Sequence, residues 1–435
     1  MPLTISPSKG LQGTIIVPGD KSISHRAAIF AALADGTSRL TDWLPAGDCM
    51  ATIEALRALG VTIDVEHTSE TAATVTVQGV GLHGLSVPEK RLNCHGSGTT
   101  MRLLTGLLAG QPFSTVLDGH EGLRRRPMER VARPLRQMGA TVVTRDGYPP
   151  IYVDGGNLHG IEYQMPIPSG QVKSAILLAG LYADSPTTVR QPGPARDHTE
   201  VLLRSLGVPI ETDGTTITVQ PAEKSLPPLD ISIPADFSSA AFPLVAAVLI
   251  PNSELRITGV NTNPTRTGLF DVLTAMGANV QIENQTDMAG EPVGDLVAKS
   301  STLRGTEVSG DTVVRMIDEF PILAVAATQA KGRTVVRDAA ELRVKESDRI
   351  KATVDELRKL GAQMIAHPDG FEVYGPTPLH AAVVDSYGDH RLAMALAVAG
   401  LLADGEMTIR NARVIADSYP GFVSMLKNLG VTVVA

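Results

Sequence analysis

A short pattern, Leu-x-x-(Leu/Met)-Gly, recurs six times along the 435 residues and limits the possible folds more than any other feature. The copies are Leu56–Gly60, Leu135–Gly139, Leu203–Gly207, Leu273–Gly277, Leu357–Gly361 and Leu426–Gly430. Their final glycines lie 79, 68, 70, 84 and 69 residues apart, and alternating strand-like residues follow them. Glycine adopts positive φ at low cost, so each copy predicts a helix that ends at a glycine and leads directly into a strand.

A second shared block precedes each copy. It consists of a helix rich in small residues, a turn and a strand, such as Thr187–Arg190 or Met407–Arg410. A common helix ending could recur by chance, but chance would not also reproduce the flanking blocks at even spacing. We therefore expect six units of roughly 70 residues, with small-residue helices at Lys21–Ala34, Gly98–Ala109, Gln171–Ala183, Phe237–Ile250, Glu319–Ala330 and His390–Ala403.

Six such units restrict the architecture. They are too large for solenoid repeats and too few for one open sheet. The alanine-rich helices are apolar on nearly all sides, which suits burial at the centre of a domain. The sequence predicts an α/β protein of two domains, each with three units, with helices inside and sheets outside. The proline-rich stretch Pro221–Pro228 follows the closing strand of the third unit, so the boundary is expected near residue 230.

Composition argues against several classes of protein. The chain is 43% hydrophobic and 19% charged, as expected for a folded globular protein. Its formal net charge of −8 argues against nucleic-acid binding, but not against small anions, which bind to a few local groups. Even the long apolar stretch Leu392–Ala403 is shorter than the ~20 residues of a membrane span. Cys49 and Cys94 are too few for a disulfide framework, and the N-terminus lacks a signal-peptide pattern, so we expect a cytoplasmic protein.

Polar, reactive residues collect at the start of the small-residue helix in each unit. A helix N-terminus offers unpaired N–H groups and a partial positive charge, which suit phosphate and carboxylate ligands. Gly19, Gly98 and Gly170 would allow a ligand to approach the backbone closely. The six segments are Pro18–Arg26, Gly96–Arg102, Pro168–Ser174, Pro234–Ser239, Ile317–Pro321 and Gly388–Arg391.

Helix capping is the simpler explanation for serine, threonine and aspartate at any one of these positions. It does not explain the cations within the first turns, because positive charge is unfavourable at a helix N-terminus. Those cations are Lys21, Arg26, Arg102, Lys173 and Arg391. As a set they indicate bound anions. Further candidates lie in Arg124–Arg126, which is also typical of a solvated surface and precedes a helix start expected at Pro127, and in the charged run Glu341–Ile350, which a solvated helix face would explain in part. Asp318, outside that run, and Glu346, within it, are carboxylates amid cations and could supply acid–base chemistry.

Other catalytic and cofactor motifs are missing from the sequence. The chain has no Walker loop, no dinucleotide fingerprint with three glycines, and no HExxH, CxxC or Gly-x-Ser-x-Gly pattern. Its ten histidines show no metal-ligand spacing. We therefore expect neither a metal nor an organic cofactor.

Taken together, these segments resemble the 5-enolpyruvylshikimate-3-phosphate (EPSP) synthase family. The likeness runs from about residue 4 to residue 430. Nine segments match family signatures in order: PGDKSISHRA, SGTTMRLL, RRRPMERVARPL, PSGQVKSAILLAG, RDHTE, NPTRTGL, IDEFPILAVAA, ELRVKESDR and GDHRLAMALA. The resemblance implies two inverted, barrel-like α/β domains of three repeats each. Residues 1–19 with 231–435 would form one domain, residues 20–230 the other, and the active site would lie in the cleft between them.

The resemblance also implies an activity. The 5-hydroxyl of shikimate 3-phosphate would attack C2 of phosphoenolpyruvate while C3 is protonated, and the tetrahedral intermediate would then eliminate phosphate. The partners would be these two small molecules, and the enzyme would be a monomer that needs no cofactor. By position, Lys21, Asp318 and Glu346 look catalytic, with Asp318 as the base and Glu346 as the acid.

Substrate contacts are implied in the same way. Shikimate 3-phosphate would contact Lys21, Ser22, Arg26, Ser169, Gln171, Asp318 and Lys345. Phosphoenolpyruvate would contact Lys21, Gly98, Arg126, Gln171, Arg349 and Arg391. Arginine forks suit carboxylate and phosphate, which is chemically consistent with this assignment.

The sequence departs from the family pattern at two places. Gly96 stands where members often have asparagine before Ser-Gly, and Ala416–Pro420 lacks the lysine that many members place there, so none is assigned near Asp417. Asp236–Ser239 is interpreted as a helix cap that lines the cleft.

Two alternatives stay open. The sister family that acts on UDP-N-acetylglucosamine carries a reactive loop cysteine and a Lys-Asn pair, whereas here Ser22 follows Lys21. A non-catalytic regulator that binds phosphorylated metabolites would not need Asp318 and Glu346, which are both present.

Overall fold

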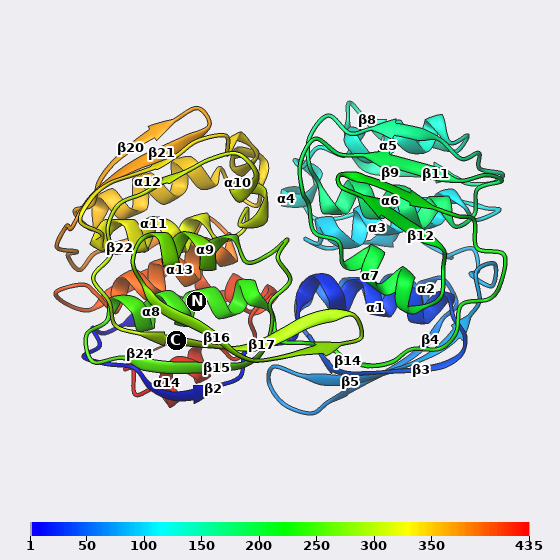
Figure 1. Cartoon of the computed structure of the whole chain (residues 1–435). Coiled ribbons are helices and arrows are strands. Elements are labelled where there is room, and N and C mark those ends of the chain that lie inside the picture. Colours follow the sequence, from blue (N-terminus) through cyan, green and yellow to red (C-terminus); the bar gives the residue numbers. More distant parts are fainter. Residues whose placement is uncertain (1, 435) are drawn as a thin grey trace. The chain divides into compact units, whose positions relative to one another are not determined.

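The computed structural model describes residues 2–434 and divides into two compact units (Figure 1). Unit 1 combines the residues up to Pro18 with Pro234–Asp287 and the residues from Pro292 onward. Unit 2 contains Gly19–Ile233 and the short segment Met288–Glu291. Each unit has a hydrophobic core of its own.

Unit 2 contains three four-stranded sheets. In chain order, their strands are β3 (Asp35–Trp43), β4 (Thr62–His67), β5 (Ala73–Val80), β6 (Leu92–Asn93), β7 (Ser114–Asp118), β8 (Thr141–Arg145), β9 (Tyr148–Asp154), β10 (Glu162–Gln164), β11 (Thr187–Arg190), β12 (Ile210–Asp213), β13 (Thr216–Val219) and β14 (Asp230–Ser232). The sheet orders are β14-β3-β5-β4, β6-β7-β9-β8 and β10-β11-β13-β12. Each sheet has a parallel pair at one edge and an antiparallel partner beside it.

Unit 1 repeats this plan three times. Its strands are β1 (Leu3–Ile5), β2 (Gln12–Ile15), β15 (Glu254–Asn261), β16 (Asn279–Met288), β17 (Glu291–Lys299), β18 (Glu307–Val308), β19 (Gly332–Val336), β20 (Gln363–His367), β21 (Gly370–Gly375), β22 (Val383–Asp385), β23 (Met407–Arg410) and β24 (Val433–Val434). The sheet orders are β16-β17-β15-β2, β18-β19-β21-β20 and β22-β23-β1-β24. The predicted α/β fold with three strand–helix repeats in each unit is confirmed.

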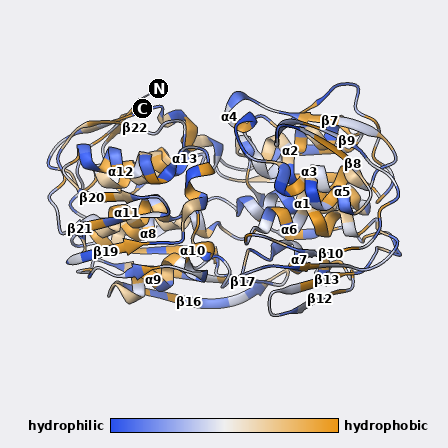
Figure 2. Ribbon diagram, turned by 90° about the horizontal axis from the view of Figure 1, so that it is seen from above, coloured by the Kyte–Doolittle hydropathy of each residue, from blue (hydrophilic) through white to orange (hydrophobic). Residues whose placement is uncertain are grey.

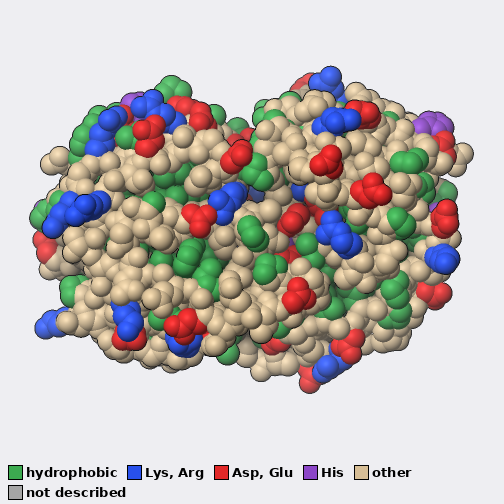
Figure 3. Space-filling view, in the orientation of Figure 1, with side chains coloured by type: hydrophobic (Ala, Val, Ile, Leu, Met, Phe, Trp, Pro, Cys, Tyr) green, Lys and Arg blue, Asp and Glu red, His purple; other side chains and the backbone are tan. Residues whose placement is uncertain are grey.

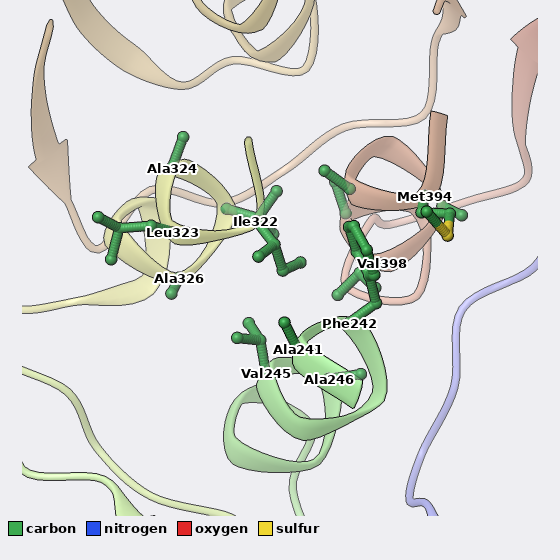
Figure 4. Packing of buried hydrophobic residues seen from close by; sticks show 14 of the residues in the cluster. Ala241, Phe242, Val245, Ala246, Ile322, Leu323, Ala324, Ala326, Met394 and Val398 are labelled. Atoms are coloured by element: carbon green, nitrogen blue, oxygen red, sulfur yellow. The ribbon is translucent and has the colours of Figure 1, made fainter. Parts of the chain in front are cut away.

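The small-residue helices form the centre of each unit. In unit 1, side chains of α8, α11 and α13 pack against one another (Figure 4), and Figure 2 shows hydrophobic residues concentrated along such helices. Their residues are buried almost throughout because alanine-rich surfaces pack closely on all sides. The central helices are α1 (Lys21–Leu33), α3 (Gly98–Ala109), α6 (Gly170–Gly180), α8 (Phe237–Leu249), α11 (Phe320–Gln329) and α13 (His390–Gly400).

A second helix of each repeat ends at the glycine of the recurring pattern. All six glycines have positive φ, between 77° and 107°, as the pattern predicts. The strands that follow them, β4, β8, β12, β16, β20 and β24, are all edge strands. These helices are α2 (Gly47–Ala58), α5 (Glu129–Gln137), α7 (His198–Ser205), α9 (Gly268–Ala275), α12 (Arg349–Lys359) and α14 (Phe422–Asn428).

Shorter helices complete the two units: α4 (Glu121–Arg124), α10 (Asp311–Arg315), η1 (Ala340–Val344) and η2 (Ala412–Asp417). Within residues 2–434, none of the helices has both the length and the hydrophobicity required to cross a bilayer. Acidic and basic side chains are interspersed on the face shown in Figure 3, in keeping with the net charge of −8.

Candidate active site

Four predicted residues of unit 2 lie at the starts of α1 and α6. Lys21 and Ser22 open α1 after Asp20, whose carboxylate accepts a hydrogen bond from the Ile23 amide at 2.9 Å. Ser169 caps α6, where its hydroxyl accepts from the Val172 amide at 3.4 Å, and Gln171 follows in the first turn. The capping and the ligand-binding interpretations are therefore compatible, because the caps occupy only some of the groups at each helix start.

Gly98 lies at the start of α3 next to two guanidinium groups. A Cβ atom at this position would lie 2.9 Å from one nitrogen of Arg102 and 3.0 Å from one nitrogen of Arg126. Any side chain would therefore displace these arginines, so glycine keeps open a small space that faces two cations and the α3 N-terminus. Such a space suits a carboxylate or phosphate.

Hydrogen bonds connect α3 with α6 at this place. Arg102 donates from Nη1 to Gln171 Oε1 at 2.6 Å, and Gln171 Nε2 donates to Thr99 Oγ1 at 2.8 Å. The two bonds fix the orientation of the Gln171 amide. Gln171 at the start of α6 and Gly98 at the start of α3 are thus brought together, and Arg126, from the segment between α4 and α5, lies beside Gly98.

Arg26 and Lys21 have well-defined protein partners. Arg26 is 3% exposed and donates to Thr199, Ser174 and the Ser22 carbonyl at 2.7, 2.6 and 2.9 Å. The Lys21 ammonium pairs with the Asp48 carboxylate at 3.1 Å. Both cations are consequently held in fixed positions beside the start of α1.

The predicted residues of unit 1 gather around the buried guanidinium of Arg349. Its Nη1 lies 3.1 Å from the Asp318 carboxylate and its Nη2 lies 2.7 Å from Glu346. Its Nε donates to Asp389 at 2.8 Å. Burial opposes the charge of Arg349, but Asp389, Glu346 and Asp318 outweigh it and raise the pKa of the guanidinium. One arginine therefore holds three carboxylates in place.

Two further cations surround this cluster. Arg391, which is 4% exposed, has its Nη2 3.7 Å from Asp318. Burial lowers the pKa of Lys345, against the opposing attraction of Asp318, Glu341 and Glu346. Lys345 is therefore less firmly charged than a surface lysine, and an added anion would favour its charged form.

Similarity to known proteins identifies the family of this chain. A model described as EPSP synthase (3-phosphoshikimate 1-carboxyvinyltransferase) matches residues 5–426. The chain belongs to the EPSP synthase family. It is 51% identical to the 3-phosphoshikimate 1-carboxyvinyltransferase of Citrifermentans bemidjiense over 98% of each chain. It is 50% identical to that of Thermodesulfovibrio yellowstonii, over 98% of this chain and 99% of the relative.

Solved structures agree with this family. An EPSP synthase from Acinetobacter baumannii matches over 100% of both chains with a TM-score of 0.87 and 41% identity. The enolpyruvyl transferase NikO from Streptomyces tendae has a TM-score of 0.80 at 23% identity, with 100% of this chain and 98% of that chain covered, which shows the shared fold. The fold, the transferase class and the shikimate-pathway family expected from the sequence are confirmed.

Several sequence-based interpretations need correction in the light of the structure of this chain. Lys173 was predicted to bind an anionic ligand, but its side chain is 1% exposed and pairs with Glu200 at 2.5 Å. The run Glu341–Ile350 is not one solvated helix face, because η1 ends at Val344 and α12 begins at Arg349. The arginine run is also divided, since Arg124 and Arg125 pair with Asp118 and Glu121, whereas Arg126 faces Gly98. Its following helix begins at Glu129 rather than Pro127.

The structure also identifies partners that the sequence analysis missed. Asp48 pairs with Lys21, and Asp389 binds Arg349 while it caps α13. Asp389 belongs to the Gly388–Arg391 segment, but its acceptor role was not recognised because the segment was interpreted through its cations. Asp236 caps α8, as expected, and also pairs with Arg266 at 2.7 Å. Among the described residues, no group of histidine, cysteine, aspartate or glutamate side chains has the arrangement of a metal site.

Proposed function

We propose that this chain transfers the carboxyvinyl group of phosphoenolpyruvate to the 5-hydroxyl of shikimate 3-phosphate and releases phosphate. The family assignment supports the reaction. The arrangement around Arg349 is the single observation that carries the chemistry, because it fixes two carboxylates next to cations that suit anionic substrates.

In the first step, Asp318 accepts the proton of the 5-hydroxyl as that oxygen bonds to C2 of phosphoenolpyruvate. Glu346, which enters this step as the protonated carboxyl, donates its proton to C3, which becomes a methyl group. Arg349 holds both carboxyl groups, at 3.1 and 2.7 Å, so the base and the acid are positioned before the substrates arrive. The product of this step is a tetrahedral adduct that retains the phosphate.

In the second step, the bond between C2 and the phosphate oxygen breaks. The methyl carbon loses a proton, to which the Glu346 carboxylate left by the first step is the proposed acceptor. The leaving phosphate takes the proton that Asp318 accepted in the first step, so Asp318 is again a carboxylate, and the carboxyvinyl double bond is restored. Both steps develop negative charge on oxygen, which preorganised arginine and lysine side chains stabilise.

The substrate contacts divide between the two units. We propose that shikimate 3-phosphate binds Lys21, Ser22, Arg26, Ser169 and Gln171 of unit 2 together with Asp318 and Lys345 of unit 1. Phosphoenolpyruvate would bind Lys21, Gly98, Arg126 and Gln171 of unit 2 with Arg349 and Arg391 of unit 1.

The decisive experiment measures phosphate release from the purified chain with both substrates and without added metal. Release that depends on both substrates is the expected result. Binding of shikimate 3-phosphate without release would favour a regulator. Release with UDP-N-acetylglucosamine instead would favour the sister activity.

The residue roles are tested with Asp318→Asn and Glu346→Gln. Each substitution keeps size and removes the proton-transferring group, so kcat should fall at least about 100-fold while KM values change little. Glu406→Gln is the control, because Glu406 is exposed and accepts a hydrogen bond from Ser6. A variant that keeps near-normal kcat would lose its assigned role.

We further propose that the enzyme is a cytoplasmic monomer. Two cysteines in 435 residues are too few for a disulfide framework, which fits a reducing compartment. All the proposed substrate contacts come from one chain. Light scattering coupled to size-exclusion chromatography would test the monomer: a mass of about 46 kDa is expected from the sequence mass of 45.8 kDa.

A further inference from the structure

A row of buried polar side chains connects α1, α2 and the start of α3 in unit 2. His25 Nδ1 lies 2.7 Å from Thr52 Oγ1, which lies 2.7 Å from Thr100 Oγ1. Thr100 Oγ1 then lies 2.8 Å from the hydroxyl of Ser97. All four side chains are fully buried at 0% exposure, so water does not compete for these hydrogen bonds.

The hydrogen bonds of this row have one direction. The Thr100 hydroxyl donates to Ser97, with the Asp48 carbonyl as a second acceptor at 3.3 Å. Its single hydrogen is then not available to Thr52, so Thr52 must donate to Thr100 and His25 must donate to Thr52. Burial, followed by the charges of Lys21 and Arg26, lowers the pKa of His25 well below 6.5. His25 is therefore a neutral imidazole with its proton on Nδ1.

The row ends next to groups that the proposed function assigns to phosphoenolpyruvate. On one side, the Asp48 carboxylate pairs with the Lys21 ammonium, and the backbone carbonyl of Asp48 is an acceptor for the Thr100 hydroxyl. On the other side, Ser97 is the N-cap of α3 and precedes Gly98. The ammonium of Lys21 and the start of α3 are thus connected through a few hydrogen bonds of fixed length.

We propose that Thr52 is a positioning residue for phosphoenolpyruvate, which sets the spacing between Lys21 and Gly98 through its two hydrogen bonds. The inference rests on the proposed function. Thr52 touches neither substrate in this scheme. Apolar side chains could fill the same space, but only directional hydrogen bonds of about 2.7 Å fix the distance between the helices this closely. Shikimate 3-phosphate should depend on Thr52 less, because Ser22, Arg26 and Ser169 are held by other contacts.

The test is Thr52→Val, which keeps the shape of the side chain and removes its hydroxyl. We expect KM for phosphoenolpyruvate to rise about tenfold, the change that corresponds to about 1.4 kcal/mol of lost binding. KM for shikimate 3-phosphate should stay within about twofold of the wild type, since Lys21 is only one of its proposed contacts and Ser22, Arg26 and Ser169 are held by other hydrogen bonds. Thr52→Ser keeps the hydroxyl and should restore the wild-type KM for phosphoenolpyruvate.

Thr105→Val is the matched control. Thr105 is also fully buried, lies in α3, and donates to the Met101 carbonyl at 2.7 Å. Its replacement should leave both KM values unchanged. Equal effects of Thr52→Val on both substrates, or the same kinetics for Thr52→Val and Thr105→Val, would overturn the proposal.

A measurement on the wild-type protein covers the case in which Thr52→Val does not fold. Nitrogen-15 NMR of labelled histidine should show His25 with a protonated Nδ1, an unprotonated Nε2 and no titration between about pH 6 and pH 8. A His25 that titrates in this range, or that populates both tautomers, would show that no fixed hydrogen bond joins it to Thr52 and would overturn the inference. Wild-type protein that releases no phosphate would instead remove the proposed function, so the two failures are distinguishable.

Discussion

Asp118 shows how a single side chain of this protein couples ionisation to stability. The Arg124 guanidinium hydrogen-bonds both carboxylate oxygens, at 2.8 and 2.7 Å, and Arg91 adds a contact at 3.0 Å. These bonds outweigh the effect of burial and lower the pKa of Asp118 to about 2, from an ordinary value of 3.8. Its side chain is 5% exposed, whereas Arg124 and Arg91 are 50% and 65% exposed. Water therefore screens the pairs.

Because of the lowered pKa of this carboxylate, the free energy of unfolding decreases as the pH falls. A group with a lowered folded pKa stabilises the fold above its unfolded pKa, and that contribution is lost as pH falls from about 4 towards 2. We expect Asp118→Asn to cost on the order of 1 kcal/mol at pH 7 after allowance for screening. The difference from the wild type should shrink as the pH falls to about 2. Urea unfolding at several pH values measures it, and Asp64→Asn, at an exposed position of β4, controls for the change in net charge. A constant difference would contradict the assignment.

The sequence allowed residue types to be predicted better than their partners. Lys21 and Lys173 occupy similar places in two repeats, yet Lys21 pairs with partly exposed Asp48 whereas Lys173 forms a buried pair with Glu200. The difference depends on which acidic residue of another element faces each lysine. No local spacing encodes that information. For the same reason, the row through Thr52 was not foreseen: its members are more than twenty residues apart, except for Ser97 and Thr100.

At the scale of elements, the recurring glycine pattern predicted local structure well because φ is a property of one residue. Each pattern glycine has positive φ and each following strand forms a sheet edge. The pairing of strands could be predicted from the sequence less well. In the sheet β22-β23-β1-β24, the interior position next to β24 is taken by β1, from the opposite end of the chain. Short strands of two or three residues carry too little pattern to specify such a partner.

Gly106 provides a prediction about the packing of helices. It lies in α3 where that helix approaches α6, and a Cβ atom there would lie 2.2 Å from the Ala175 carbonyl oxygen. Alanine would gain about 1 kcal/mol of helix propensity, but separating two packed backbones should cost more, about 3 kcal/mol. We expect Gly106→Ala to lower the melting temperature clearly. Gly156→Ala, with no atom within 4 Å of its added Cβ, should change it little. An unchanged or higher melting temperature for Gly106→Ala would show that α3 and α6 can separate at no cost.

At the scale of the whole molecule, the order of the chain makes the two units unequal. Unit 2 is continuous from Gly19 to Ile233 except for Met288–Glu291. Unit 1 needs the N-terminal segment, because β1 pairs with both β23 and β24 and β2 pairs with β15. The sequence indicated a boundary near residue 230 from its proline-rich stretch. The need for the first strands inside unit 1 came only from the family resemblance, since it depends on long-range pairing.

This inequality predicts how fragments of the chain behave. Residues 19–233 should unfold cooperatively on their own, although less stably than in the full chain, because buried His198 loses its 2.6 Å contact with Glu291. Residues 234–435 should not fold alone, since removal of β1 leaves unpaired strand edges on β23 and β24. The matched variant joins residues 1–18 to 234–435 through a short glycine linker, which is feasible because the Asp236 amide donates to the Pro18 carbonyl at 2.8 Å. Circular dichroism and calorimetry should show a cooperative transition for the joined form and none for 234–435. If the fragment without residues 1–18 unfolds cooperatively at the same temperature as the joined form, β1 and β2 are dispensable and the unequal roles of the two units are refuted.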